Sequence, residues 1–163
     1  MENPSGLFFG VNPEIAPYAS RLPRADDSGG WPQILRDLNL ARAIQANLLV
    51  VGAEHLVARL VDLLATQANL EAVVQCQGDQ LNLPPASPSL GAVVLRDVDA
   101  LNQQGQHRLL QWLGSARHDR QIITTASGRL LPLVNAGTFN DALYYRLNTI
   151  YIDLTVQSRQ RVY

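Results

Sequence analysis

The run Leu48-Leu-Val-Val-Gly52 is the clearest indication of the fold of this chain, because it consists of four consecutive aliphatic residues followed by a glycine. A run that is short and apolar at every position is typical of a strand buried on both faces, as in a parallel sheet. A helical pattern follows at once, from about His55 to Thr66, with leucines along one face. A buried strand that leads directly into an amphipathic helix predicts an α/β unit.

The same alternation of strands and helices extends to both sides of this run. Before it, the apolar spacing from about Pro32 to Ile44 predicts a helix with proline in its first turn. Short apolar strands alternating with helices predict a three-layer α/β/α core around a mainly parallel, five-stranded sheet. The other expected strands are Ala72–Gln75, Ala92–Leu95, Gln121–Thr125 and Thr149–Leu154, and the other expected helical segments are Gln106–Leu113, Leu130–Ala136 and Asn140–Leu147.

The length of 163 residues fits one domain with a sizeable core. Residues 1–33 are rich in proline, glycine, serine and aspartate and predict an irregular N-terminal arm. Within the arm, Leu7–Val11 is either a short strand or an apolar plug against the domain. Residues 34–163 form the α/β domain in this interpretation.

Composition excludes several classes of function. The formal net charge is −1, so no overall positive field attracts nucleic acid, and direct DNA binding is not expected. No apolar run is long enough to span a bilayer, and no membrane partner is expected. The single cysteine, Cys76, suits a reducing compartment and predicts a cytoplasmic location. All 13 basic residues are arginine, so no lysine is available to bind a phosphate.

Three stretches carry a specific likeness to a known family. Gly91-Ala-Val-Val-Leu-Arg-Asp-Val-Asp-Ala-Leu101 resembles the Walker B strand and its exit, G-T-L-F-L-D-E-I-x-x-L, in the AAA+ domain of sigma-54-dependent transcription activators. Phe139-Asn-Asp-Ala-Leu-Tyr-Tyr-Arg-Leu-Asn148 is similar to the family's F-R-E-D-L-Y-Y-R-L-N, and Leu56-Val-Ala-Arg59 matches its L-V-A-R. The likeness covers roughly residues 35 to 160 and implies a P-loop-like fold.

The position of the family's Walker A loop departs from the pattern. The family has G-E-S-G-T-G-K-E before L-V-A-R, whereas only Gly52-Ala-Glu-His55 precedes Leu56 here. Glu54 falls where the lysine would stand, and a carboxylate repels a triphosphate. Either the site is reshaped for another ligand, or this is a plain strand-to-helix turn with Glu54 at the helix N-terminus. The plain turn is the preferred interpretation.

The Walker B and sensor positions have also changed. Arg96 replaces the aspartate that holds magnesium, and an arginine cannot ligate a hard cation. It either contacts phosphate directly or pairs with Asp97, Asp99 or Glu54, and the ion pair is preferred. The resemblance therefore implies a degenerate nucleotide cleft without catalytic residues, bound ATP or metal, formed by Gly52, Glu54, Arg96, Asp97 and Ser127.

The second motif implies an interface. Asn140 stands in place of its first arginine, and Arg146 keeps the second. Arg146 either acts across a subunit boundary or pairs internally with Asp141 or Asp153. Tyr144 and Tyr145 are interpreted as core and interface packing. The sigma-contacting G-A-F-T-G-A loop is missing between residues 80 and 90, and the helical lid and the helix-turn-helix are expected to be absent.

The resemblance and its departures together predict a pseudo-ATPase module that does not hydrolyse ATP. Its expected role is a transcription-regulatory protein-interaction domain, with an intact sigma-54 activator or a second copy as the partner. A nucleotide-binding domain without turnover is the alternative, in which Arg96 or Arg59 replaces the lysine. An enzyme of unrelated chemistry ranks last, since the three histidines and Cys76 lack metal-ligand spacing.

Overall fold

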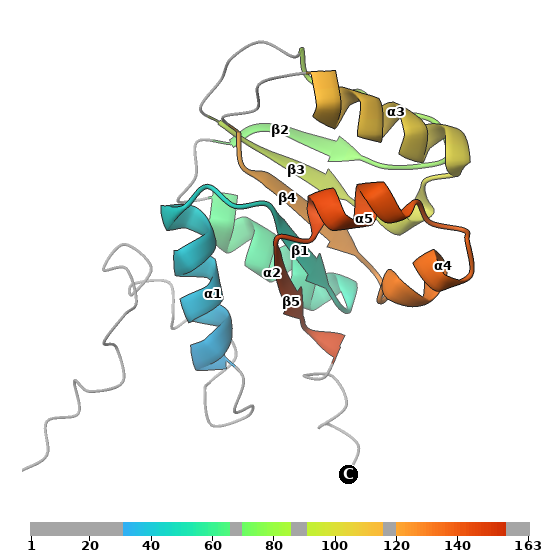
Figure 1. Ribbon diagram of the computed structural model, residues 1–163. Coiled ribbons are helices and arrows are strands. Elements are labelled where there is room, and N and C mark those ends of the chain that lie inside the picture. Colours follow the sequence, from blue (N-terminus) through green and yellow to red (C-terminus); the bar gives the residue numbers. More distant parts are fainter. Residues whose placement is uncertain (1–30, 66–69, 86–90, 116–119, 156–163) are drawn as a thin grey trace, which may run out of the picture.

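The structure, a computed structural model, describes residues 31–65, 70–85, 91–115 and 120–155 (Figure 1). The first helix, α1, spans Trp31–Ala43. Residues 31–33 are therefore helical, which corrects the expectation of an irregular arm up to residue 33. Pro32 is tolerated there because the first turn of a helix leaves its backbone N–H groups unbonded in any case. The rest of the arm, Leu7–Val11 included, lies outside the described residues.

Five strands form one sheet in which every pairing is parallel. The strand order is β2-β3-β4-β1-β5, so β1 lies between β4 and β5. This confirms the expected five-stranded sheet and makes it parallel throughout. The strands are β1 (Leu48–Val51), β2 (Leu70–Gln75), β3 (Ala92–Arg96), β4 (Ile122–Ala126) and β5 (Ile150–Asp153).

Helices cover both faces of this sheet, as expected for a three-layer fold. Helices α1 and α2 lie on one face, and α3, α4 and α5 lie on the other (Figure 1). A 3-10 turn, Val98–Ala100, follows β3. The helices after α1 are α2 (Glu54–Ala65), α3 (Gln103–Ser115), α4 (Leu131–Asn135) and α5 (Asp141–Leu147).

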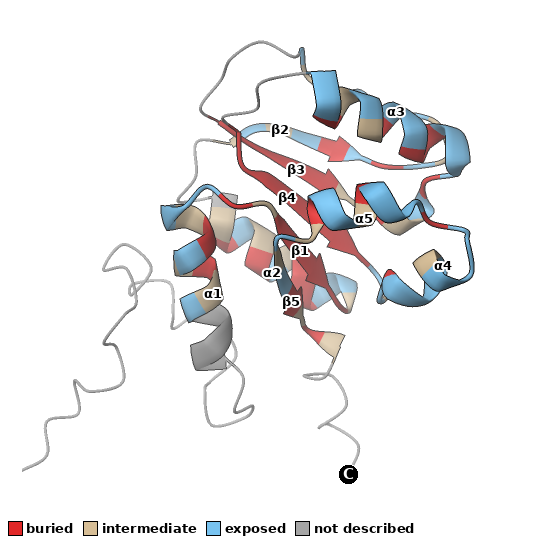
Figure 2. Cartoon of the chain, viewed as in Figure 1, coloured by how far each residue is buried: buried red, intermediate tan, exposed pale blue. Residues whose placement is uncertain are grey.

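Strand β1 contributes side chains to two separate hydrophobic cores. Leu48 and Val50 pack with α1 and α2, whereas Leu49 and Val51 pack with α3 and α5. Alternate residues of a strand point to opposite faces, so a strand that is covered twice must be apolar at every position. Strands β1, β3 and β4 are buried along their length, while the edge strand β2 exposes much of its surface (Figure 2).

The strand order places a crevice at one end of the sheet. The connection from β1 leads toward the β2 side, and the connection from β4 leads to β5 on the other side. Ligands of open α/β sheets bind where neighbouring connections diverge in this way, outside the carboxyl ends of the strands. A ligand-binding site is therefore expected at the carboxyl ends of β1, β3 and β4.

Candidate nucleotide cleft and interface

The structure brings all five predicted cleft residues to that edge of the sheet. Gly52 and Glu54 follow β1, Arg96 ends β3, Asp97 comes directly after it, and Ser127 follows β4. Strands that run parallel deliver their carboxyl ends to one edge, which is why residues far apart in sequence meet here.

The connection from β1 to α2 is a two-residue turn that is packed against β5. Gly52 N–H donates to the carbonyl of Ala126 at 3.2 Å, and Leu154 N–H donates to the carbonyl of Val51 at 2.7 Å. A Cβ on Gly52 would lie 2.6 Å from the Cβ of Leu154. The glycine is thus required by the close approach of the chain leaving β5.

Helix α2 begins immediately after this turn. Its first residue is Glu54, and the N–H groups of Leu56 and Val57 both bond to the carbonyl of Ala53 at 3.0 Å. A carboxylate in the first turn of a helix interacts favourably with the positive end of the helix dipole. The interpretation of residues 52–55 as a plain strand-to-helix turn agrees with this geometry.

Arg96 makes a loose ion pair across the cleft. Its Nη2 lies 3.9 Å from Oε1 of Glu54, and the side chains are 36% and 89% exposed. Of the three partners expected for Arg96, Glu54 is the one found within ion-pair distance. An exposed pair at this distance contributes little to stability, since water screens both charges.

Asp97 is held by a separate set of contacts. Its backbone is left-handed, with φ of 57° and ψ of 50°, a conformation that costs energy for a residue other than glycine. Its N–H donates to Oγ1 of Thr125 at 3.1 Å, and its carboxylate accepts from Nε2 of Gln75 at 2.7 Å. These contacts turn the Asp97 carboxylate toward the edge strand β2.

Ser127 is paired with Asp99. The backbone N–H of Ser127 lies 3.3 Å from both carboxylate oxygens of Asp99, and the Ser127 hydroxyl donates to one of them. Asp99, which follows β3, was not among the predicted site residues. Its place three residues after the end of a buried strand is the signal that points to it.

A pocket of about 440 Å³ opens beside these groups. It offers carboxylate, carboxamide and hydroxyl groups, and no arginine stands among its described lining residues. Burial, and then the charges of Asp97 and Asp99, raise the pKa of the Cys76 thiol to about 12, so this cysteine is an unreactive thiol. The pocket is lined by Gln75, Cys76, Gln77, Asp97, Asp99, Ala100 and Ser127.

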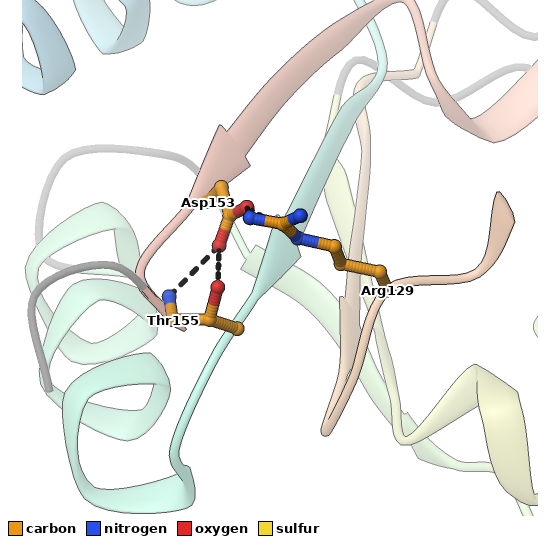
Figure 3. A network of polar contacts seen from close by, with 3 residues as sticks. All are labelled: Arg129, Asp153 and Thr155. Atoms are coloured by element: carbon orange, nitrogen blue, oxygen red, sulfur yellow. Dashed lines mark hydrogen bonds and ion pairs between the residues drawn. The ribbon is translucent and has the colours of Figure 1, made fainter. Parts of the chain in front are cut away.

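A polar network that the motifs do not predict links β4 to β5 (Figure 3). Arg129, after β4, places Nε and Nη2 at 2.9 and 2.8 Å from Oδ2 of Asp153. Oδ1 of Asp153 accepts from the N–H of Thr155 at 2.8 Å and from its hydroxyl. Because β1 lies between β4 and β5, the Arg129–Asp153 pair spans the carboxyl end of β1.

The predicted interface residues all belong to α5 or its cap. Asn140 caps the helix, since its Oδ1 accepts from Leu143 N–H at 2.9 Å. Tyr144 is half-buried and stacks edge-on against Tyr145, which is 70% exposed. Arg146 lies in the last turn of α5, at the opposite edge of the sheet from the cleft. Its expected pairing with Asp153 is corrected: the ion-pair partner of Asp153 is Arg129.

A buried glutamine connects the two motif regions. Gln106 of α3 is 3% exposed and donates through Nε2 to the carbonyls of Leu101 and Thr138, both at 3.1 Å. Its Oε1 accepts from the N–H of Asn140 at 2.8 Å. Gln106 therefore fixes the exit of β3 relative to the start of α5, a structural role that the motif alone does not reveal.

Between residues 31 and 155, leaving out the gaps, no three His, Cys, Asp or Glu side chains gather as metal ligands. None of the helices described in this range combines the length and apolar character needed to cross a membrane.

Comparisons with known proteins agree with the α/β fold described above. The sequence pattern of the sigma-54 interaction domain matches residues 28–156, most of the chain. No curated protein matches the chain. Among solved structures, the chain is similar to NtrX from Brucella abortus in complex with ATP, at 15% identity and a TM-score of 0.60, over 85% of this chain and 38% of that one.

The ADP complex of NtrX is similar at 15% identity and a TM-score of 0.52, over 73% of this chain and 36% of that one. The P-loop NTPase domain of a sigma-54 transport activator from E. coli is similar at 20% identity and a TM-score of 0.51, over 81% of this chain and 96% of that one. The chain spans less than two fifths of the NtrX chains. At these identities, the likenesses show the fold, an α/β fold of the P-loop NTPase type.

Proposed function

The chain belongs to the sigma-54 interaction domain family, and from this premise we propose that it is a member that does not hydrolyse ATP and serves as a transcription-regulatory protein-interaction domain in the cytoplasm. The observation that carries the proposal is the turn from β1 to α2. A triphosphate needs a cradle of unengaged backbone N–H groups and, in P-loop proteins, a lysine. Here the Gly52 N–H bonds to Ala126, Leu154 packs against the turn, and the chain contains no lysine.

The charges at the same edge support the proposal. The turn is followed by the Glu54 carboxylate, and the pocket beside it is lined by Asp97 and Asp99. The Arg129–Asp153 pair spans the end of β1. These residues fit a triphosphate poorly, because the carboxylates repel it.

Exposed apolar side chains on α4 and α5 support the interaction role. Leu131 and Leu133 of α4 are 47% and 36% exposed, and α4 buries none of its residues. Tyr145 of α5 is more exposed still. We name Leu131, Leu133 and Tyr145 the α4–α5 surface. Tyrosine and leucine bury large apolar area on binding, and tyrosine is enriched at protein interfaces.

The nucleotide half of the proposal is tested by calorimetric titration of the purified chain with Mg-ATP, with its mass measured in parallel. We expect no heat of binding up to millimolar ATP and no phosphate release. A sigma-54 interaction domain that retains its P-loop lysine serves as the positive control. Micromolar binding or measurable turnover would overturn the proposal.

The partner half is tested by co-purification with an intact sigma-54 activator. We expect Tyr145→Asp to abolish recovery, because a charge in the α4–α5 surface must be desolvated on binding. Gln111→Asp, which adds the same charge to an exposed position of α3, is the matched control and should bind normally. Recovery of neither wild type nor control, or equal recovery of all three proteins, would contradict this role.

One observation favours a nucleotide-binding domain without turnover as a second candidate. Arg96 is partly exposed and only loosely paired, so its guanidinium is able to turn from Glu54 to a phosphate. This candidate predicts a thermal shift with ATP or ADP that is lost in Arg96→Ala. The absence of a shift in the wild-type chain would exclude it.

A further inference from the structure

A second pocket, of about 300 Å³, lies at the opposite end of the sheet from the cleft. It is bounded by the residues that precede or begin three strands: Asn47 before β1, Ile122 at the start of β4 and Thr149 before β5. Its volume is at the lower end of the range for small-molecule sites. The lining is Gln45, Ala46, Asn47, Leu113, Arg120, Ile122, Arg146 and Thr149.

The polar groups of this pocket are suited to a negatively charged ligand. They include two guanidinium groups, two carboxamides and one hydroxyl, and no carboxylate is present among the described lining residues. Arginine binds oxyanions through short, charge-assisted hydrogen bonds, often by two parallel N–H groups. The charged groups of this pocket are opposite in sign to those of the 440 Å³ pocket at the carboxyl ends of the strands, which is lined by Asp97 and Asp99.

Arg120 gives the pocket a fixed donor. Its side chain is 1% exposed, and its Nη2 lies 3.1 Å from Oε1 of Glu71 and 3.0 Å from the carbonyl of Pro85. Glu71 is not part of the lining, so its carboxylate holds the guanidinium from outside the pocket. Because Glu71 balances the charge of Arg120, the uncompensated positive charge among the described lining residues is that of Arg146.

Arg146 is positioned by its neighbours. Asn47 donates from Nδ2 to the Arg146 carbonyl at 3.0 Å and accepts from the Ile122 N–H at 3.2 Å, which ties the end of α5 to the start of β4. Gly114 of α3 borders the guanidinium, since a Cβ there would make an ordinary van der Waals contact with Nη1 of Arg146, at 3.6 Å. A site whose backbone is held in place loses less entropy when it binds a ligand.

A simpler role for Arg146 is to compensate the negative end of the α5 dipole. That role accounts for a positive charge at this position. It does not require a second, buried guanidinium at a shared pocket, nor a lining whose described residues include no carboxylate. We propose that this amino-edge pocket binds a tetrahedral oxyanion of the phosphate class between Arg120 and Arg146, independently of the interaction role proposed above.

The test is a titration of the full chain with inorganic phosphate at constant ionic strength, followed by amide chemical shifts. The backbone signals of Gln45, Asn47 and Thr149 should move in a saturable way at millimolar phosphate. Arg146→Gln should weaken binding about tenfold, the effect of losing one charge-assisted contact. It is preferred to an Arg120 variant, which would leave Glu71 buried without its partner.

Arg129→Gln is the matched control, since it removes the same charge at the opposite end of the sheet. It should retain the phosphate affinity within about twofold, because Arg129 follows the carboxyl end of β4 and the pocket lies at the amino ends of the strands. Sodium acetate at the same ionic strength should bind more weakly than phosphate. No saturable shift at the three amides, an equal loss in both arginine variants, or equal shifts with sodium chloride would each overturn the proposal.

Discussion

Thr124 of β4 carries a fully buried hydroxyl that has no hydrogen-bond partner among the residues that the structure describes. Burying a hydroxyl without a partner costs about 1–3 kcal/mol. Thr124→Val should therefore raise the free energy of unfolding by about 1 kcal/mol in urea denaturation. The neighbouring Thr125→Val should instead lower it, because the Thr125 hydroxyl accepts from the Asp97 N–H. A less stable Thr124→Val protein would show that the hydroxyl is satisfied in solution.

Gly52 is constrained by its contact with the chain leaving β5. Gly52→Ala places a Cβ 2.6 Å from that of Leu154, closer than carbon atoms can approach, so the end of β5 must shift. We expect a loss of about 2 kcal/mol in the free energy of unfolding. Gly128→Ala meets no heavy atom within 4 Å and should change stability by less than about 0.5 kcal/mol. Equal effects of the two substitutions would contradict the close packing of the turn.

At the scale of secondary-structure elements, the Arg129–Asp153 pair links β4 to β5. Burial alone would raise the pKa of Asp153, but hydrogen bonds from Thr155 and the charge and hydrogen bond of Arg129 outweigh it, and the pKa lies below its ordinary value. The stabilisation by this carboxylate is therefore present above about pH 4 and is lost as the pH falls through its native pKa.

Arg129→Ala should lower the free energy of unfolding by about 1 kcal/mol at pH 7, a modest value because more than half of the Arg129 side chain is exposed. The deficit should shrink as the pH falls below about 4 and through the lowered native pKa of Asp153, where the native carboxylate becomes protonated. Arg59→Ala, at an exposed position of α2, is the control and should show no such dependence. A deficit that stays constant from pH 7 to pH 3 would exclude the carboxylate as its source.

The elements were largely predictable because their apolar periodicity is local. The structure confirms the five expected strands, with boundaries shifted by one or two residues, as in β2, which begins at Leu70 rather than Ala72. Helix α3 extends beyond its predicted ends on both sides, to Gln103 and Ser115. Its polar terminal turns, which are exposed, carry no periodic apolar signal from which to place a boundary.

At the scale of the whole molecule, parallel strands explain why the motif residues form one cleft. Each predicted cleft residue stands at or just after the end of a strand, and one edge of the sheet collects them all. The residues that close and shape this edge were not predictable in the same way. Asp99 and Arg129 belong to different connections and Asp153 ends β5, so their contacts depend on the order of the strands.

The order of strands is likewise a property of the folded chain. β1 and β5 are neighbours although about 100 residues separate them, and β4 lies on the other side of β1. No local pattern encodes this order, because each apolar strand presents the same aliphatic surface to any neighbour. The amino-edge pocket, which joins residues 45–47, Leu113, Arg120, Ile122, Arg146 and Thr149, is a consequence of that order.

The sequence alone predicts the α/β class, the parallel sheet with two covered faces, the family and the positions at which the nucleotide motifs have changed. These depend on residue type and on spacing along the chain, which are local. Three contacts are seen in the tertiary structure alone: Leu154 packs against Gly52, Arg129 binds Asp153 across the end of β1, and Arg120 and Arg146 line one pocket. Those contacts depend on distances between segments far apart in sequence, which are set when both faces of the sheet are packed.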